Sequence, residues 1–320
     1  MQRTLLTAAL LALLSILAGC QRDFYAKQIV QPDTGHGRRV LWLTGSAESL
    51  LEDGHIDAHK TVTVADGAEL DVWVLKARQD DGSPAATPAT ASVLILHDVG
   101  DSKASYLSLG KRLARRGYDV ILPDLRAHGR SGGKYVTWGA KEAPDLNAVV
   151  DALAIGKTVA TDTVYVFGGG GMGGGIAIQY AALDPRVKGV MALTPFKDIG
   201  FTRRALMTVA PTMSGEDFQA VLVHAGRLAD FDPADASTVN AAAKLRCPLL
   251  VVHGLLDLFV PLDNSEAVVE AAPEPKQLVV VPWASSVGLL IGQEDWIADQ
   301  LHNIATTGLK QPVPEPEQSE

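Results

Sequence analysis

The chain has 320 residues, of which 47% are hydrophobic and 20% are charged, so it is long and apolar enough for a globular fold rather than a disordered chain. Its 28 Lys and Arg side chains are outnumbered by 37 Asp and Glu, which gives a net charge of -9. This balance leaves no basic surface for phosphates and argues against nucleic acid as a partner. Two cysteines are too few for a disulfide framework.

The amino terminus has the pattern of a secretory signal. A cation at Arg3 is followed by an apolar run over residues 5–17, which is too short to span a membrane comfortably, and then by small residues. The tetrad Leu17-Ala18-Gly19-Cys20 resembles the lipobox of bacterial lipoproteins. The alternative is a chance cysteine after an ordinary signal peptide.

The lipobox resemblance implies that residues 1–19 are a signal peptide and that Cys20 carries acyl chains in a lipid bilayer. It further implies a place in the bacterial cell envelope. Gln21 rather than an aspartate follows the cysteine, which favours the periplasmic face of the outer membrane.

The segments at the two ends of the mature chain lack a clear fold pattern. Residues 20–57 are polar and rich in turn residues apart from a short apolar run, so we expect a lipidated stalk with at most one strand. Residues 311–320 are mostly proline and glutamate and predict a disordered tail. The folded domain is expected over residues 58–310.

Within that domain, short apolar runs alternate with helix-length segments. Residues 59–64 and 69–77 predict an antiparallel hairpin. Continuous Val, Ile and Leu runs then predict a mostly parallel sheet with helices on both faces, with strands at 91–97, 118–124, 163–167, 187–194, 248–254 and 277–282. The stretch from about 196 to 245 has helical pattern without a good strand and predicts a small helical cap insertion.

The order of these elements, together with two motifs, resembles the α/β-hydrolase fold over nearly the whole mature chain. One predicted strand ends in His97-Asp98-Val99-Gly100, where the family commonly has His-Gly-x-Gly. The next strand leads into a family-like loop that contains Asp124, Arg126, Gly129 and Ser131. The resemblance implies a hydrolase scaffold with a Ser-His-acid triad and no cofactor.

The triad itself is degenerate in this sequence. Aligning the G-x-S-x-G elbow on residues 169–173 puts Gly171 where the nucleophilic serine belongs. Asp257 stands at the acid position, and Ser286 replaces the histidine that should follow the last strand. Since the nucleophile and the base perform the bond making and proton transfer, the sequence predicts no intact catalytic site.

The remaining candidate residues suggest binding. The backbone N–H groups of Val99 and Met172 align with the oxyanion donors of the family, and His97 and Asp98 lie beside them. A carboxylate at Asp98 would oppose the negative charge that acyl transfer develops. We therefore expect a non-catalytic lipoprotein that binds a small molecule or a periplasmic protein; the alternative is a weak or non-triad hydrolase acting on small esters or acyl substrates.

The sequence has neither a complete dinucleotide fingerprint nor a metal-binding motif. Gly169, Gly171 and Gly174 fit G-x-G-x-x-G, but the following strand ends in Thr194-Pro195 without the acidic residue that would bind the ribose. No HExxH or CxxC spacing occurs. Neither a nucleotide cofactor nor a metal is expected.

Overall fold

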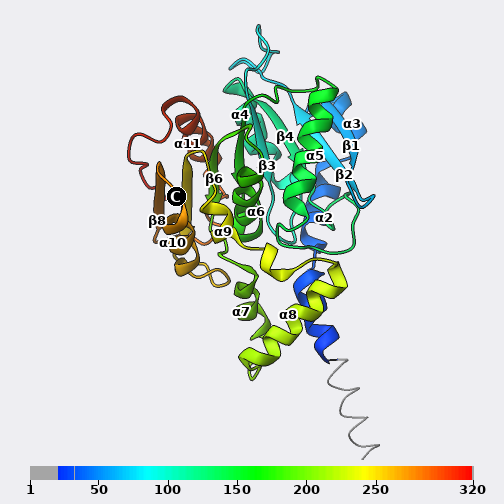
Figure 1. The fold of residues 1–320 in the computed structure, drawn as a ribbon. Coiled ribbons are helices and arrows are strands. Elements are labelled where there is room, and N and C mark those ends of the chain that lie inside the picture. Colours follow the sequence, from blue (N-terminus) through cyan, green and yellow to red (C-terminus); the bar gives the residue numbers. More distant parts are fainter. Residues whose placement is uncertain (1–20, 32, 319–320) are drawn as a thin grey trace, which may run out of the picture.

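The computed structural model describes residues 21–31 and 33–318, so the predicted signal peptide and Cys20 lie outside the described residues. Figure 1 shows a central sheet with helices packed against it, and a smaller helical group beyond one end of the sheet. Among the residues described, no helix has the length and apolar character needed to cross a bilayer.

The sheet has eight strands in the order β1-β2-β4-β3-β5-β6-β7-β8. Their bounds match the predicted runs closely because each apolar run is bracketed by turn residues. They are β1 Ala58–Thr63, β2 Glu69–Leu75, β3 Ser92–Leu96, β4 Asp119–Pro123, β5 Val164–Gly168, β6 Val187–Leu193, β7 Leu249–Gly254 and β8 Lys276–Val281.

The pairing confirms the predicted hairpin and the mostly parallel sheet. Strands β1 and β2 are antiparallel, with Ala58 opposite Val74, and β2 pairs antiparallel with β4. All further pairs, from β4–β3 to β7–β8, are parallel. The carboxyl ends of these parallel strands therefore share one edge, and the loops that leave this edge carry the candidate site.

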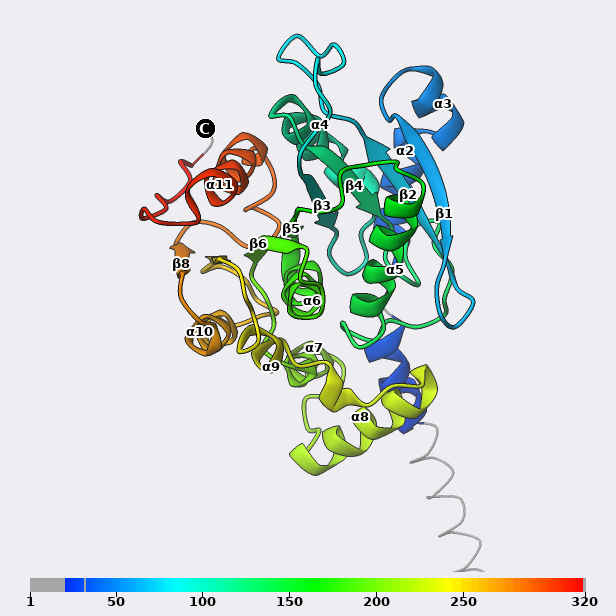
Figure 2. The same cartoon turned by 45° about the horizontal axis from the view of Figure 1, so that its top comes forward.

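Helices cover both faces of the sheet, as predicted (Figure 2). One face is packed by α5 (Glu142–Ile155), α6 (Gly170–Leu183) and α10 (Leu262–Ala271), and the other by α4 (Leu107–Arg115) and α11 (Glu294–Thr307). Alternate residues of each strand enter the two cores: Leu94 and Leu96 face α6, whereas Val93 and Ile95 face the α4 side. Burial on both faces explains the continuous apolar runs.

The cap occupies the predicted segment, and its regular elements are helices joined by loops. It contains η2 (Ile199–Phe201), α7 (Thr202–Leu206), α8 (Gly215–Ala229), η3 (Pro233–Asp235) and α9 (Thr238–Ala242). Helix α8 begins at Ser214, whose side chain accepts the N–H of Asp217 at 3.0 Å. Helices α7 and α8 lie beyond the end of the sheet, next to the first helical residues of the chain (Figure 1).

The predicted stalk is wrong, because this segment is helical and packed on the domain. Residues 21–30 are helical, followed by α2 (Gly35–Thr44) and α3 (Ala47–Glu52). Ala26, Ile29 and Val30 are buried in the same core as α6. Their helical spacing gives a narrow apolar stripe on a polar segment, and such a stripe is easily mistaken for a turn-rich linker.

The carboxyl-terminal tail also differs from the prediction. Residues 311–318 have no regular secondary structure, but they lie against the domain. The side chain of Gln277 accepts the N–H of Val313 at 2.8 Å and donates to the carbonyl of Gln311 at 2.7 Å. Gln293 donates to the carbonyl of Glu317 at 2.8 Å. Side-chain amides from the domain therefore hold a segment that has little apolar surface of its own.

Candidate functional site

The sharp turn between β5 and α6 is the elbow of the fold. Helix α6 begins at Gly170, which has φ of 63°. Gly171 is not among the residues with positive φ. In an α/β-hydrolase the nucleophile occupies the strained turn position, so the backbone favours Gly170 over the predicted Gly171 as the equivalent of the missing serine.

The glycines of the elbow leave room that other side chains occupy. A Cβ atom built on Gly169 would lie 2.3 Å from the hydroxyl oxygen of Tyr106, and one built on Gly170 would lie 2.1 Å from Cγ of Asp98. A Cβ on Gly168 would lie 2.3 Å from the carbonyl oxygen of Gly173. Asp98 therefore fills the space in which a serine side chain would stand.

The Asp98 carboxylate accepts the N–H of Met172, one of the two donors predicted when the elbow is aligned on Gly171. Its Oδ1 accepts the N–H of Met172 at 2.9 Å. Burial raises the pKa of Asp98 to about 7, against the opposing effect of the N–H groups of Met172 and Val99. Met172, one of the two predicted donors, thus binds a carboxyl group of this chain, whereas with the elbow at Gly170 the residue after the nucleophile position is Gly171. Met172 is itself buried, so only its backbone takes part.

The acid and base positions meet as the family alignment implies, without the chemistry of a triad. Asp257 Oδ1 accepts the N–H groups of Phe259 at 2.9 Å and Val260 at 2.7 Å, and Oδ2 accepts the N–H of Ser286 at 3.3 Å. Asp257 thus binds its own loop to the loop after β8. Ser286, which stands where the histidine belongs, supplies a backbone N–H to this carboxylate.

The two histidines nearest the elbow are structural. His97 Nε2 accepts the N–H of Leu125 at 2.9 Å, and Nδ1 lies 2.8 Å from the carbonyl oxygen of Asp98. His128 Nε2 accepts the N–H of Gly100 at 3.1 Å. Burial lowers the pKa of both imidazoles. His97 is fully buried and is not among the residues that line the pocket above the elbow, and its predicted role in ligand binding stays a prediction.

A pocket of about 320 Å³ opens above the elbow. Asp98, Val99, Gly170 and Ser286 line it, together with residues that the sequence reasoning missed. The missed lining residues are Asp33, His36, Arg39, Gly100, Asp101, Tyr106, Val287 and Leu290. His36 and Arg39 belong to α2. They were not predicted as site residues because residues 20–57 were assigned to a stalk. The amphipathic helix pattern of that segment could have predicted a helix packed on the domain.

The charge of the pocket is mixed. Asp33, Asp98 and Asp101 contribute carboxyl groups, and His36 and Arg39 contribute basic groups. Burial raises the pKa of Asp101. Such a lining suits a small polar ligand with groups of both signs. Within residues 21–31 and 33–318, no set of three or more His, Cys, Asp or Glu side chains is placed to hold a metal ion.

Known proteins resemble this chain in sequence over part of its length. The family described as "Serine aminopeptidase, S33" matches residues 87–231. The protein YqkD of Bacillus subtilis is 27% identical over 206 residues, covering 62% of this chain and 65% of YqkD. A monoacylglycerol lipase of Mycolicibacterium smegmatis is 28% identical over 227 residues, covering 59% of this chain and 79% of the lipase.

Solved structures show the same fold. The esterase Pf2001 of Pyrococcus furiosus superposes with a TM-score of 0.61 at 22% identity, covering 80% of this chain and 94% of the esterase. Acetyl xylan esterase 1 of Thermoanaerobacterium gives a TM-score of 0.59 at 19% identity, covering 78% and 83%. The chain is an α/β-hydrolase-fold protein. The family match covers less than half of the chain, and the solved structures establish the fold.

Proposed function

We propose that this protein is a membrane-anchored α/β-hydrolase-fold lipoprotein that binds a small polar ligand, or a periplasmic protein, at the pocket above the elbow and does not hydrolyse it. The observation that carries the proposal is the position of Asp98. Its carboxyl group fills the space of the missing nucleophile at Gly170 and accepts the N–H of Met172 at the start of α6, where it would oppose the negative charge of an oxyanion.

The proposal also includes the lipid anchor. The lipobox-like Leu17-Ala18-Gly19-Cys20 supports acylation at Cys20, and Gln21 supports the periplasmic face of the outer membrane. Expression with radiolabelled palmitate in a bacterial host tests this part. We expect label on the wild-type chain and none on Cys20→Ser; label that remains on the serine variant refutes the anchor.

The non-catalytic part is tested with a fluorophosphonate probe and with short p-nitrophenyl esters. Without a serine at the elbow, no probe adduct forms there, and ester turnover equals that of a surface-matched control protein. An active serine esterase serves as the positive control. Turnover above the control that falls on Asp257→Asn would show a working triad and refute the proposal.

A hydrolase that uses no triad is the second candidate, and His36 is the observation that favours it. This exposed imidazole lines the same pocket as Asp98 and Ser286 and comes from a helix outside the elements that normally supply the triad. It could act as a general base on a bound water. If ester turnover exists and His36→Gln abolishes it while Asp257→Asn does not, this second function replaces the first.

A further inference from the structure

The first described residue leaves the molecule on the side of the cap. Residues 21–30 form a helix beside α8, at the end of the molecule where the cap lies (Figure 1). His224 of α8 lies 3.2 Å from Asp23, and Asp23 also pairs with Lys27 at 2.6 Å. Because consecutive Cα atoms are about 3.8 Å apart, an anchor at Cys20 allows almost no tether between this face and the lipid.

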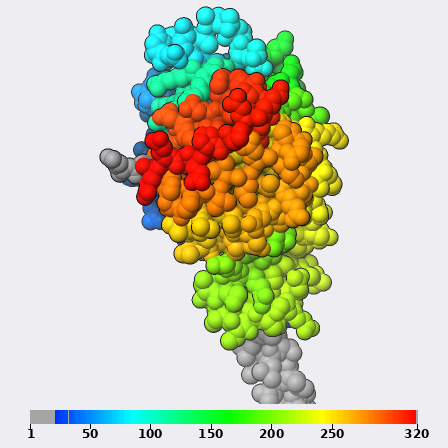
Figure 3. Space-filling model, turned by 90° about the vertical axis from the view of Figure 1, so that its left-hand side faces the viewer, coloured from blue at the N-terminus to red at the C-terminus, as the bar shows by residue number. Residues whose placement is uncertain are grey.

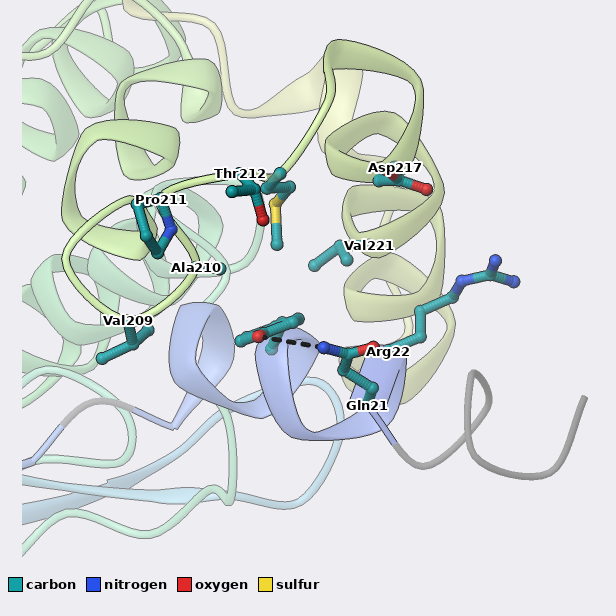
Figure 4. A pocket seen from close by; sticks show the side chains of 10 residues that line it. Gln21, Arg22, Val209, Ala210, Pro211, Thr212, Asp217 and Val221 are labelled. Atoms are coloured by element: carbon teal, nitrogen blue, oxygen red, sulfur yellow. Dashed lines mark hydrogen bonds between the residues drawn. The ribbon is translucent and has the colours of Figure 1, made fainter. Parts of the chain in front are cut away.

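A pocket of about 350 Å³ lies between the first helix and the cap (Figure 4). Gln21, Arg22 and Tyr25 line it from the helix, and Val209 and Val221 are among the cap residues that line it. Gln21 Nε2 donates to the hydroxyl of Tyr25 at 3.3 Å. The helix and the cap thus form one continuous surface around the point where the chain would enter the bilayer.

That surface exposes large apolar side chains. Phe24 is 51% exposed and packs edge-on against Tyr25, and Val209 is 57% exposed at the pocket rim. Met207, in the same segment after α7, is also exposed. We call Phe24, Met207 and Val209 the cap patch. Side chains of this kind beside an anchor point are those expected at the boundary of headgroups and acyl chains.

Two exposed arginines belong to the helices next to the cap patch, although the chain as a whole carries a net charge of -9. Arg22 and Arg204 are exposed, and neither forms an ion pair with another described residue. Basic side chains near a bilayer are attracted to anionic lipid headgroups by about 1 kcal/mol each. Arg22 therefore lies on the face from which the anchor would leave, where it lines the same pocket as Asp217.

We propose that the cap patch rests on the bilayer, so that the cap faces the membrane. The edge of the sheet at which the parallel strands begin then points away from the membrane. This inference rests on the lipid anchor of the proposed function. The cap lies beyond the end of the sheet on the side from which Gln21 leaves (Figure 1). The same face is seen from another side in Figure 3, where the cap narrows to the end of the molecule.

The test uses the full lipidated chain in proteoliposomes of phosphatidylethanolamine and phosphatidylglycerol. In a Cys247→Ala background, Phe24→Cys, Val209→Cys and Ile155→Cys are each given a nitroxide spin label. Ile155 is the matched control, because it is 86% exposed and ends α5, which runs antiparallel to the strands and so ends at the opposite edge. Power saturation compares access of oxygen, which enters lipid, with access of a neutral nickel chelate, which stays in water.

We expect the labels at positions 24 and 209 to show a several-fold higher ratio of oxygen to nickel access than the label at 155. Equal, water-like ratios at all three positions on a chain that stays with the vesicles would overturn the orientation and leave the anchor intact. A wild-type chain that carries no palmitate and does not stay with the vesicles would overturn both. Unchanged melting temperatures of the labelled variants exclude misfolding as the cause.

Discussion

Cγ of Asp98 lies 2.1 Å from the position that a Cβ atom of residue 170 would occupy, so these two positions cannot both carry full side chains in this conformation. Gly170→Ser should therefore lower the free energy of unfolding by about 2 to 4 kcal/mol, because a left-handed φ and steric overlap act together. Adding Asp98→Gly removes the overlap, so the double variant should regain about 1 to 3 kcal/mol relative to Gly170→Ser. Urea titrations of the four proteins in the cycle measure this coupling.

Gly171→Ser is the matched control for the placement of the elbow. Its backbone is not left-handed, and the nearest atom to its Cβ would be Cγ2 of Val260 at 3.0 Å, a side-chain end that can move. We expect a smaller loss than for Gly170→Ser and no rescue by Asp98→Gly. If Gly171→Ser is instead the variant that Asp98→Gly rescues, residue 171 is the elbow position.

Asp98 should also make stability depend on pH. Burial raises the pKa of Asp98 from the usual 3.8 to about 7. Between these values the folded state holds a proton that the unfolded state has lost, so stability falls as pH rises through this window. Above pH 7 the ionised Asp98 lowers the free energy of unfolding by its full amount. This amount is about 2 to 4 kcal/mol, with allowance for solvent screening at this partly exposed group.

Asp98→Asn isolates this effect because an amide oxygen can still accept the N–H of Met172. The variant should exceed the wild type in stability at pH 8, and the difference should shrink toward pH 4. Denaturant titrations across this range give the comparison. A difference that is constant with pH would mean that Asp98 titrates normally in the folded protein.

The sequence predicted the sheet better than the site, and particular residues explain why. Strands such as β3 and β7 are buried on both faces, so their apolar runs are unambiguous. The position of the missing nucleophile could not be assigned from the sequence, because residues 168–171 are all glycine. Only the backbone φ distinguishes Gly170 from Gly171. The nucleophile is missing under either alignment, because both candidate positions are glycine. The helix that brings His36 to the pocket was missed because its apolar face is narrow.

Asp257 is predicted to stabilise two loops rather than to orient a base. It accepts three backbone N–H groups, from Phe259, Val260 and Ser286. Asp257→Ala should lower the free energy of unfolding by about 1 to 3 kcal/mol, and Asp257→Asn by less, since one amide oxygen still accepts. Thermal unfolding ranks the variants. Equal stability of all three proteins would show that these hydrogen bonds are replaced by water without loss.

Rebuilding the triad tests whether Asp98 blocks the scaffold from catalysis. Gly170→Ser restores the nucleophile at the left-handed position, and Ser286→His places an imidazole on the residue whose N–H lies 3.3 Å from Asp257 Oδ2. With Asp98 present, its carboxyl group overlaps the new serine, so we expect no adduct with a fluorophosphonate probe. Adding Asp98→Gly frees this space, and this triple variant should be labelled. The same triple set built with Gly171→Ser in place of Gly170→Ser is the control and should remain unlabelled, because its hydroxyl starts from a helical backbone. Labelling of the double variant that retains Asp98 would show that this carboxyl group moves aside readily and does not keep the site inactive.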